Sequence, residues 1–265
     1  MAKPKVGLAL GAGGARGLAH LGVLEVFERE NLPVDMICGS SMGAVVGGIY
    51  AVGTDVSMLI KILPTLDAME YFDVVNPKHG GLLRGERFHD LIRMFSKNAT
   101  FSQTRTPFSC VAVDVARGEL VVLDRPDMRV DEAIRASMSI PGVFLPHVLD
   151  GRVLVDGGVL SRLPAATVRG MGADIVIGVD VGYRHGDVCD LENHGTIVDY
   201  LMAATDIMAW EITKMHEKEA DLVLLPNVHC CDPNSFADAP KAVQAGREAA
   251  EQALPQIRSL LAAFA

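Results

Sequence analysis

The chain is poor in several features that mark particular classes of protein. Aromatic residues make up 5% of it, with a single Trp. Basic residues are in the minority, 24 Lys and Arg against 33 Asp and Glu, so the formal net charge is −9. Because surfaces that bind nucleic acid carry a positive surplus, this balance argues against a nucleic-acid partner.

Cysteine is also scarce. The five cysteines are an odd number without the paired spacing of a disulfide framework, which indicates reduced thiols in a cytosolic protein. One local group, His229-Cys230-Cys231-Asp232, has residue types that can ligate a metal, but no second C-x-x-C or H-x-x-x-H pair accompanies it. We interpret it as a loop before Pro233 and expect no metal.

The chain lacks a convincing leader or membrane anchor. The uncharged run 6–15 is mostly glycine and alanine and is ended by Arg16, which is not typical of a signal peptide. The uncharged stretch 36–54 is nominally long enough to span a bilayer, but its five glycines and two serines indicate strand, turn and helix instead. We therefore expect a soluble, cytoplasmic protein.

What the chain does contain is the composition of a globular protein. It has 265 residues, of which 49% are hydrophobic and 22% charged, enough for one large α/β domain. Short apolar runs typical of buried strands cover 6–10, 34–38, 108–115, 120–123, 153–155, 175–181 and 222–225. Helical patterns cover 16–30, 42–52, 130–138, 196–219 and 240–263.

This alternation of apolar strands and helices predicts an α/β fold with a mostly parallel central sheet covered on both faces, a three-layer sandwich with helical insertions. We expect one catalytic domain over 6–225, in which 54–105 is a mostly helical candidate cap. The loop and helix over 226–265 are expected to pack on the same domain.

The first chemical motif is G-x-S-x-G, formed by Gly39-Ser40-Ser41-Met42-Gly43. It follows a predicted strand and opens a predicted helix, as a nucleophile elbow requires, and its glycines allow close backbone packing in the turn. The alternative is that Ser41 is only an N-cap for that helix.

The second motif is the glycine-rich turn after the first strand, from Gly11 to Gly17. Such a turn points backbone N–H groups at an anion, either a phosphate or the oxyanion of an acyl-transfer intermediate. A dinucleotide site is disfavoured because Arg16 stands where G-x-G-x-x-G needs glycine, and no Gly-Lys-Ser/Thr follows for a Walker loop. A purely structural turn is the remaining alternative.

The third motif is Asp156-Gly157-Gly158 at the end of a predicted strand. The end of that strand should lie at the sheet edge that carries Ser41, where a carboxylate in hydrogen-bond reach could accept the serine proton. The alternative is an Asx-turn cap, which needs no partner elsewhere in the chain.

The order of these motifs resembles the patatin-like phospholipase family, which includes bacterial patatin-like proteins and the catalytic domain of neuropathy target esterase. Four blocks carry the resemblance: LALGAGGARGLAHLGVL, ICGSSMGAVVGG, RASMSIPGVFLP and LVDGGVLSRLPA. It extends from about residue 6 to residue 181 and is weaker through the candidate cap. One departure is Ala12, where many members have glycine.

The resemblance implies a function and a set of site residues. Ser41 matches the family's nucleophile and Asp156 its base, a Ser–Asp dyad without histidine. The oxyanion loop matches Gly13 and Gly14, closed by Arg16 and Gly17. The glycines that support the motifs are Gly11, Gly39, Gly43, Gly157 and Gly158.

The implied activity is hydrolysis of lipid acyl esters, of phospholipase A or lysophospholipase type, with no metal or organic cofactor. The protein would meet this substrate by transient contact with a membrane surface, so we expect it in the cytoplasm and at the periphery of the membrane. Three alternatives remain: acyl transfer on the same dyad, a non-catalytic regulator that keeps the fold, and a triad completed by a late histidine. The candidates for that histidine are His185, His194, His216 and His229.

Overall fold

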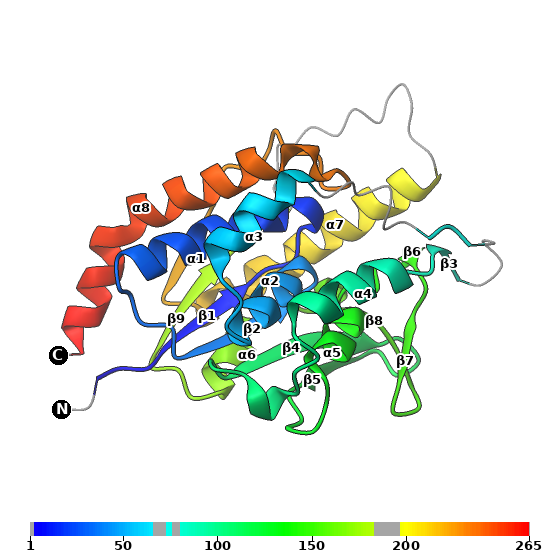
Figure 1. The fold of residues 1–265 in the computed structure, drawn as a ribbon, viewed down its shortest axis with the longest axis horizontal. Coiled ribbons are helices and arrows are strands. Elements are labelled where there is room, and N and C mark those ends of the chain that lie inside the picture. The colour runs from blue at the N-terminus through cyan, green and yellow to red at the C-terminus, as the bar shows by residue number, and fades with distance from the viewer. Residues whose placement is uncertain (1–2, 66–72, 76–79, 183–196, 265) are drawn as a thin grey trace.

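The computed structural model describes residues 3–65, 73–75, 80–182 and 197–264 of the chain. Within these residues the main sheet has eight strands in the order β10-β9-β1-β2-β4-β8-β7, with β5 beside β4 (Figure 1). The strands of this sheet are β1 (Val6–Leu10), β2 (Met36–Ser40), β4 (Phe108–Asp114), β5 (Glu119–Leu123), β7 (His147–Leu149), β8 (Arg152–Asp156), β9 (Ile175–Val179) and β10 (Leu222–Leu224).

The central strands of the sheet run parallel to one another. β10 pairs with β9, β9 with β1, β1 with β2 and β2 with β4, all in parallel. β5 and β8 are antiparallel to β4, and β7 is antiparallel to β8. The prediction of a mostly parallel α/β sheet is therefore confirmed, and the strands expected over 108–115 and 120–123 pair with each other as a hairpin.

Helices cover both faces of the sheet. They are α1 (Ala19–Arg29), α2 (Met42–Ala51), α3 (Val56–Ile62), α4 (Glu86–Phe95), α5 (Val130–Ser137), α6 (Ala165–Gly170), α7 (Ile197–His216) and α8 (Ala239–Ala263). Leu8 and Leu10 of β1 pack into one core cluster with α1, α2 and α8, whereas Ala9 packs into a second cluster with α6. Alternate residues of a strand point to opposite faces, so the apolar strand read in the sequence is buried on both sides.

The last helix returns to the first. α8 lies along α1 in Figure 1, and the two helices approach closely through glycine. A Cβ on Gly246 would collide with the carbonyl oxygen of Ala19, and one on Gly22 with that of Val243. The loop and helix over 226–265 thus contact the elements that open the chain.

The described residues of the region 54–105 form helices and one short strand. Their elements are α3, the short 3₁₀ helix η2 (Leu63–Thr65), β3 (Gly81–Leu83), α4 and the short η5 (Phe101–Gln103). β3 pairs with β6 (Gly142–Phe144) in a separate two-stranded sheet. Three-residue strands are too short to show a period, which explains why β3, β6 and β7 escaped the sequence analysis.

Two predicted boundaries were wrong by a few residues. The helix expected from residue 16 begins at Ala19, because Gly14–Leu18 forms the tighter 3₁₀ helix η1. The strand expected over 34–38 runs from Met36 to Ser40, which brings its end directly to Ser41. Both shifts lie at turns, where local patterns are least informative.

Candidate active site

Ser41 lies on a sharp turn between β2 and α2. Its backbone has φ 53° and ψ −121°, a conformation that L residues with a side chain rarely adopt. Glycines on either side make the turn possible: a Cβ on Gly39 would meet the backbone of Ala44, and one on Gly43 would meet the carbonyl of Leu10. The strained strand-to-helix turn is the geometry of a nucleophile elbow.

The hydroxyl of Ser41 donates a hydrogen bond of 2.5 Å to Oδ2 of Asp156. Both side chains are buried, with relative exposures of 4% and 5%. Ser41 makes no side-chain cap hydrogen bond to α2, so the N-cap alternative does not describe its hydroxyl. Its backbone N–H donates instead to the hydroxyl of Ser137 at the end of α5, at 3.0 Å.

The register of the sheet brings Asp156 to Ser41. β2 ends with Ser40 opposite Val111 of β4, and β4 continues to Asp114. β8 pairs with that extension and runs back, so that Asp156 stands opposite Ala112, one residue beyond the Ser40 level. The sequence argument placed both residues at one edge because both end strands. That reason was wrong, since β8 is antiparallel and its pairing register decides the contact.

The carboxylate of Asp156 is held at both oxygens. Oδ2 accepts the hydrogen bond from Ser41, and Oδ1 accepts one from the backbone N–H of Gly158 at 2.7 Å. The backbone N–H of Asp156 donates to the carbonyl of Ser139 at 2.9 Å. The Asx-turn alternative is therefore also true, but it uses only one oxygen. Gly157 is required here, because a Cβ would collide with the carbonyl of Val111.

Burial changes the acidity of Asp156. Desolvation raises its pKa from 3.8 to about 6, against the hydrogen bonds from Ser41 and Gly158, which lower it. The negative charge of Asp206 on α7 raises the pKa further. A carboxylate with a pKa near neutrality is a stronger base than an ordinary aspartate, yet it is still ionised at pH 7.

Some backbone N–H groups of the glycine-rich turn have hydrogen-bond acceptors and others have none among the described residues. The N–H groups of Gly11, Ala12 and Ala15 donate to the carbonyls of Val179, Arg162 and Pro233, respectively, at 2.8–3.0 Å. Those of Gly13 and Gly14 have no acceptor among the residues that the structure describes. Gly14 has φ 56°, and a Cβ there would collide with the carbonyl of Pro233. Two adjacent free N–H groups can hold an anion.

Arg16 and Gly17 lie in η1 behind these donors. Nε of Arg16 donates to the carbonyl of Cys231 at 2.9 Å, which ties the turn to the loop before η8 (Phe236–Asp238). Gly17 leaves room for the side chain of Met42, because a Cβ at position 17 would collide with it. Both residues thus contact the framework of the turn.

His20 also supports the turn, and its position near a motif was the only signal in the sequence that could have pointed to it. Its ring is fully buried, and its Nε2 lies 2.8 Å from the carbonyl of Gly11. Burial lowers its pKa to about 4, so the ring is neutral at pH 7 and Nε2 donates. A neutral donor can fix the Gly11 carbonyl without placing a charge beside the site.

A cavity of about 180 Å³ opens in front of Ser41. Apart from Ser41 and Asn234, its lining consists of glycine, proline and apolar side chains. The lining residues are Gly14, Ala15, Ser41, Met42, Val45, Leu83, Phe88, Met138, Ile140, Val143, Phe144, Pro233, Asn234 and Phe236. The cavity suits an apolar ligand that carries one polar group at the serine.

Of the late histidines, only the side chain of His229 lies among the described residues. His185 and His194, and the side chain of His216, lie outside the described residues. His229 is exposed on the loop after β10, and Ser41 and Asp156 bond to other partners. In the same loop Asn234 donates its backbone N–H to Asp232 at 2.8 Å, as expected for a turn around Pro233.

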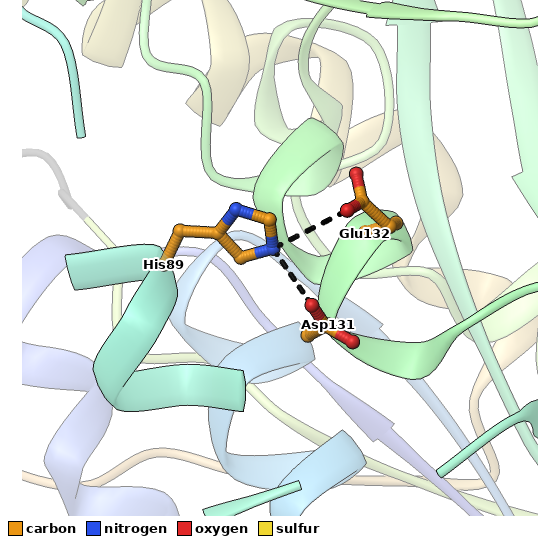
Figure 2. Close-up of side chains that lie close together, drawn as sticks. All are labelled: His89, Asp131 and Glu132. Carbon is orange, nitrogen blue, oxygen red and sulfur yellow. Dashed lines mark hydrogen bonds and ion pairs between the residues drawn. The ribbon is translucent and has the colours of Figure 1, made fainter. Parts of the chain in front are cut away.

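A different group brings metal-ligand residue types together. Figure 2 shows His89 of α4 with its Nε2 2.9 Å from Asp131 and 3.9 Å from Glu132, both at the start of α5. Arg129 binds both oxygens of Asp131, and Arg93 lies 3.2 Å from one of them. The guanidinium groups occupy the oxygens that a cation would need, so we interpret the cluster as an ion-pair network.

Taken together, the site presents a serine on an elbow, a buried carboxylate that accepts its hydrogen bond and two backbone N–H groups without an acceptor among the described residues, all beside an apolar cavity. This arrangement can activate a serine as a nucleophile. Residues 8–169 match the sequence profile of the family described as Patatin-like phospholipase. The chain belongs to this family, whose class is lipid ester hydrolase.

Relatives in sequence agree with the family. An uncharacterized NTE family protein of Mycobacterium bovis is 40% identical over 196 residues, which cover 73% of this chain and 54% of that protein. A protein named Lysophospholipase NTE1 from Coccidioides immitis is 32% identical over 183 residues, 67% of this chain and 11% of that protein. The chain thus spans about half the length of the mycobacterial relative and a small part of the other.

Solved structures share the fold. VipD from Legionella pneumophila superposes with a TM-score of 0.69 at 14% sequence identity, covering 96% of this chain and 67% of VipD. Human GIVD cytosolic phospholipase A2 superposes with a TM-score of 0.50 at 12% identity, covering 98% of this chain and 59% of that structure. In the described part of the chain, no helix has the length and apolar character needed to cross a membrane.

Proposed function

We propose that the protein hydrolyses carboxylic ester bonds of lipids, in the manner of a phospholipase A or a lysophospholipase, with Ser41 as nucleophile and Asp156 as base. The observation that supports it best is the 2.5 Å hydrogen bond between Ser41 Oγ and Asp156 Oδ2 on a strained elbow. An ordinary capping serine would have neither the conformation nor this partner.

The reaction would proceed in two steps. Ser41 Oγ attacks the acyl carbonyl while Asp156 takes its proton, and the proton then passes to the leaving alcohol. Asp156 next accepts a proton from water, whose oxygen attacks the carbonyl of the acyl-serine. When this second tetrahedral intermediate collapses, the proton passes from Asp156 to Ser41 Oγ and the fatty acid leaves. Because Asp156 accepts a hydrogen bond directly from the Ser41 hydroxyl, this route needs no histidine, metal or organic cofactor.

The N–H groups of Gly13 and Gly14 would stabilise the tetrahedral oxyanion. They are unoccupied among the described residues, and Gly14 lines the same cavity as Ser41. One such donor is typically worth about 3 kcal/mol in the barrier. Arg16, Gly17 and His20 would act as positioning residues, because they hold the turn from behind.

The wider setting is part of the same proposal. A single catalytic domain over 6–225, with 54–105 as its cap and 226–265 packed against it, would act in the cytoplasm and meet its lipid by transient contact with a membrane surface. The name of the Coccidioides relative supports a lysophospholipid as the first substrate to test.

The test is release of fatty acid from p-nitrophenyl esters and from lysophosphatidylcholine. We expect Ser41→Ala to abolish turnover, and Asp156→Asn to lower kcat by about 10²–10⁴-fold, because a base that takes the proton contributes that much. His147→Ala, at a histidine bonded to Glu132, is the matched control and should keep turnover. Retention of most activity in Asp156→Asn would show that the base lies elsewhere.

A further inference from the structure

Arg135 of α5 carries a buried charge that no step proposed above uses. Its side chain is 5% exposed, and burial lowers the pKa of its guanidinium, against the negative charges of Glu86, Asp73 and Glu132, which raise it. Among the described residues, each hydrogen bond that the guanidinium donates ends on a neutral oxygen. A buried cation without a bonded carboxylate is costly, so stability alone does not explain why an arginine lies here.

The guanidinium contacts three separate segments of the chain. Nη1 donates to the hydroxyl of Ser139 at 2.7 Å, and Nη2 donates to the carbonyls of Arg84 at 2.6 Å and Leu145 at 3.1 Å. Arg84 follows β3 in the candidate cap, Ser139 comes just after α5, and Leu145 follows β6. Because the guanidinium is planar and its donors point in fixed directions, it holds all three acceptors in one arrangement.

Ser139 connects this group to the candidate base. Its side chain is fully buried, and its hydroxyl also donates to the carbonyl of Arg135 at 2.8 Å, so both the proton and a lone pair of the hydroxyl are used. The backbone carbonyl of Ser139 accepts the N–H of Asp156 at 2.9 Å, and the carboxylate of Asp156 accepts the hydroxyl of Ser41. A continuous series of contacts therefore joins the guanidinium to the nucleophile.

The other two acceptors belong to a wall of the cavity in front of Ser41. β3 pairs with β6, with Leu83 opposite Phe144, and both residues line that cavity. The Cζ atom of Arg135 lies 5.8 Å from the centre of the Phe144 ring, a cation–π distance. Gly85, with φ 79°, permits this close packing, because a Cβ there would lie 2.9 Å from the Phe144 ring and 3.1 Å from Nη2 of Arg135. The same guanidinium thus contacts the candidate cap and the segment that holds the base.

We propose that Arg135 is a positioning residue: through Ser139 it ties the β3–β6 wall of the cavity to the backbone of Asp156, and so keeps the base aligned with the nucleophile. The inference rests on the proposed function and adds a residue to its site. Without the guanidinium, the wall and the base lose the group that both contact, and the carboxylate can shift relative to the serine. A displacement of about 1 Å at a reacting group can lower the rate about 100-fold.

The test is hydrolysis of p-nitrophenyl butyrate by Arg135→Met and Ser139→Ala, alone and combined. Arg135→Met should lower kcat by about 10–100-fold, and Ser139→Ala by about tenfold. If the two residues act through one series of contacts, the double variant should stay within about twofold of Arg135→Met, whereas two independent structural effects would multiply. Arg135→Lys keeps the charge but not the planar fork, so it should recover less than about half of the lost kcat.

Arg169→Met is the matched control. Arg169 of α6 also donates to backbone carbonyls, those of Ala173 and Asp174, but these residues precede β9 at the end of the parallel strands opposite the site. This variant should keep the kcat of the parent.

A second measurement needs no activity. Amide hydrogen exchange of Asp156, whose N–H bonds to the carbonyl of Ser139, should be faster in Arg135→Met and in Ser139→Ala than in the parent. The amides of β9 should exchange as in the parent, because the contacts of Arg135 do not include that strand.

The outcomes separate the proposal from the proposed function. Parent-like kcat in Arg135→Met, full recovery in Arg135→Lys, or multiplied losses in the double variant each overturn the proposal. If Arg135→Met does not fold, Ser139→Ala decides, since it leaves the bonds to Arg84 and Leu145 in place, and an unchanged kcat then overturns the proposal. If the parent chain hydrolyses no ester, the proposed function fails, and amide exchange decides: faster exchange of Asp156 in the variants supports the series of contacts, and unchanged exchange overturns it.

Discussion

At the scale of single residues, the proposed chemistry depends on the carboxylate of Asp156. Asp156 is buried among groups that cannot solvate its charge, and two hydrogen-bond donors compensate only in part, so its pKa rises to about 6. In the proposed mechanism, ionised Asp156 is the form that accepts the proton of Ser41. We therefore infer that the site trades stability for a usable base.

This trade predicts opposite pH dependences for activity and stability. The folded chain binds the proton of Asp156 more tightly than the unfolded chain, so the contribution of this group to stability is largest below about pH 4 and is lost as the pH rises through 6. Asp156→Asn should raise the free energy of unfolding at about pH 7 by up to about 3 kcal/mol, and by much less near pH 4.

Urea unfolding of parent and variant at both pH values measures this difference. In the parent, kcat/KM should rise with pH through about 6, because the base form increases. Asp127→Asn is the control, since that side chain is 79% exposed. If Asp156→Asn is less stable than the parent at neutral pH, the argument that burial raises the pKa of Asp156 is contradicted.

At the scale of elements, the ion-pair network fastens α4 to α5. Asp131 is fully buried at the first turn of α5. Its carboxylate accepts hydrogen bonds from His89 and Arg93 of α4 and from Arg129. Burial raises the pKa of Asp131, but hydrogen bonds from His89 and Arg129 outweigh it and hold the pKa below its usual value. α5 ends at Ser137, whose hydroxyl accepts a hydrogen bond from the backbone N–H of Ser41, so the network connects α4 to the elbow.

Removing the charge of Asp131 should loosen this connection. We expect Asp131→Asn to lower the free energy of unfolding by about 2 kcal/mol, less than for a fully buried pair because Arg93 and Arg129 remain about a third exposed. Thermal or urea unfolding measures the loss. Asp90→Asn, which breaks an exposed pair with Arg93 on α4, should cost less than about 0.5 kcal/mol. Equal effects in the two variants would show that the buried network contributes nothing special.

At the scale of the whole molecule, contacts between the two ends of the chain complete the core. Ala242, Val243 and Ala250 of α8 lie in the same cluster as Leu21 and Leu24 of α1. The two helices also exchange ion pairs at their rims, including Arg29 with Glu251 and Arg258 with Glu30, which are exposed and contribute little. Close apolar packing therefore carries this interface.

Gly246 is the sharpest probe of that packing. A methyl group there would strike the carbonyl of Ala19, so Gly246→Ala should destabilise the protein by about 1–3 kcal/mol despite the higher helix propensity of alanine. Gly170→Ala is the matched control: Gly170 is also helical, but a Cβ there meets nothing within 4 Å, so the change should be neutral or stabilising. Melting temperatures of the two variants measure the contrast, and similar shifts would contradict close packing between α1 and α8.

Much of this fold could be predicted from local patterns. Doubly apolar strands such as Val6–Leu10 and Ile175–Val179 indicate a parallel sheet, because only a sheet covered on both faces buries both sides of a strand. Elements such as β3, β6 and α6 could not be predicted, since they are too short to show a period. Their existence depends on partners far away in the chain.

The candidate site divides in the same way. The sequence by itself determined the elbow at Ser41 and the glycine-rich turn, because each is a local backbone conformation that only particular residues permit. The tertiary structure alone decided that Asp156 reaches Ser41, that His20 and Ser137 hold the surrounding backbone, and that an apolar cavity lies beside the site. These contacts depend on strand register and helix packing between distant segments, which leave no local pattern in a single sequence.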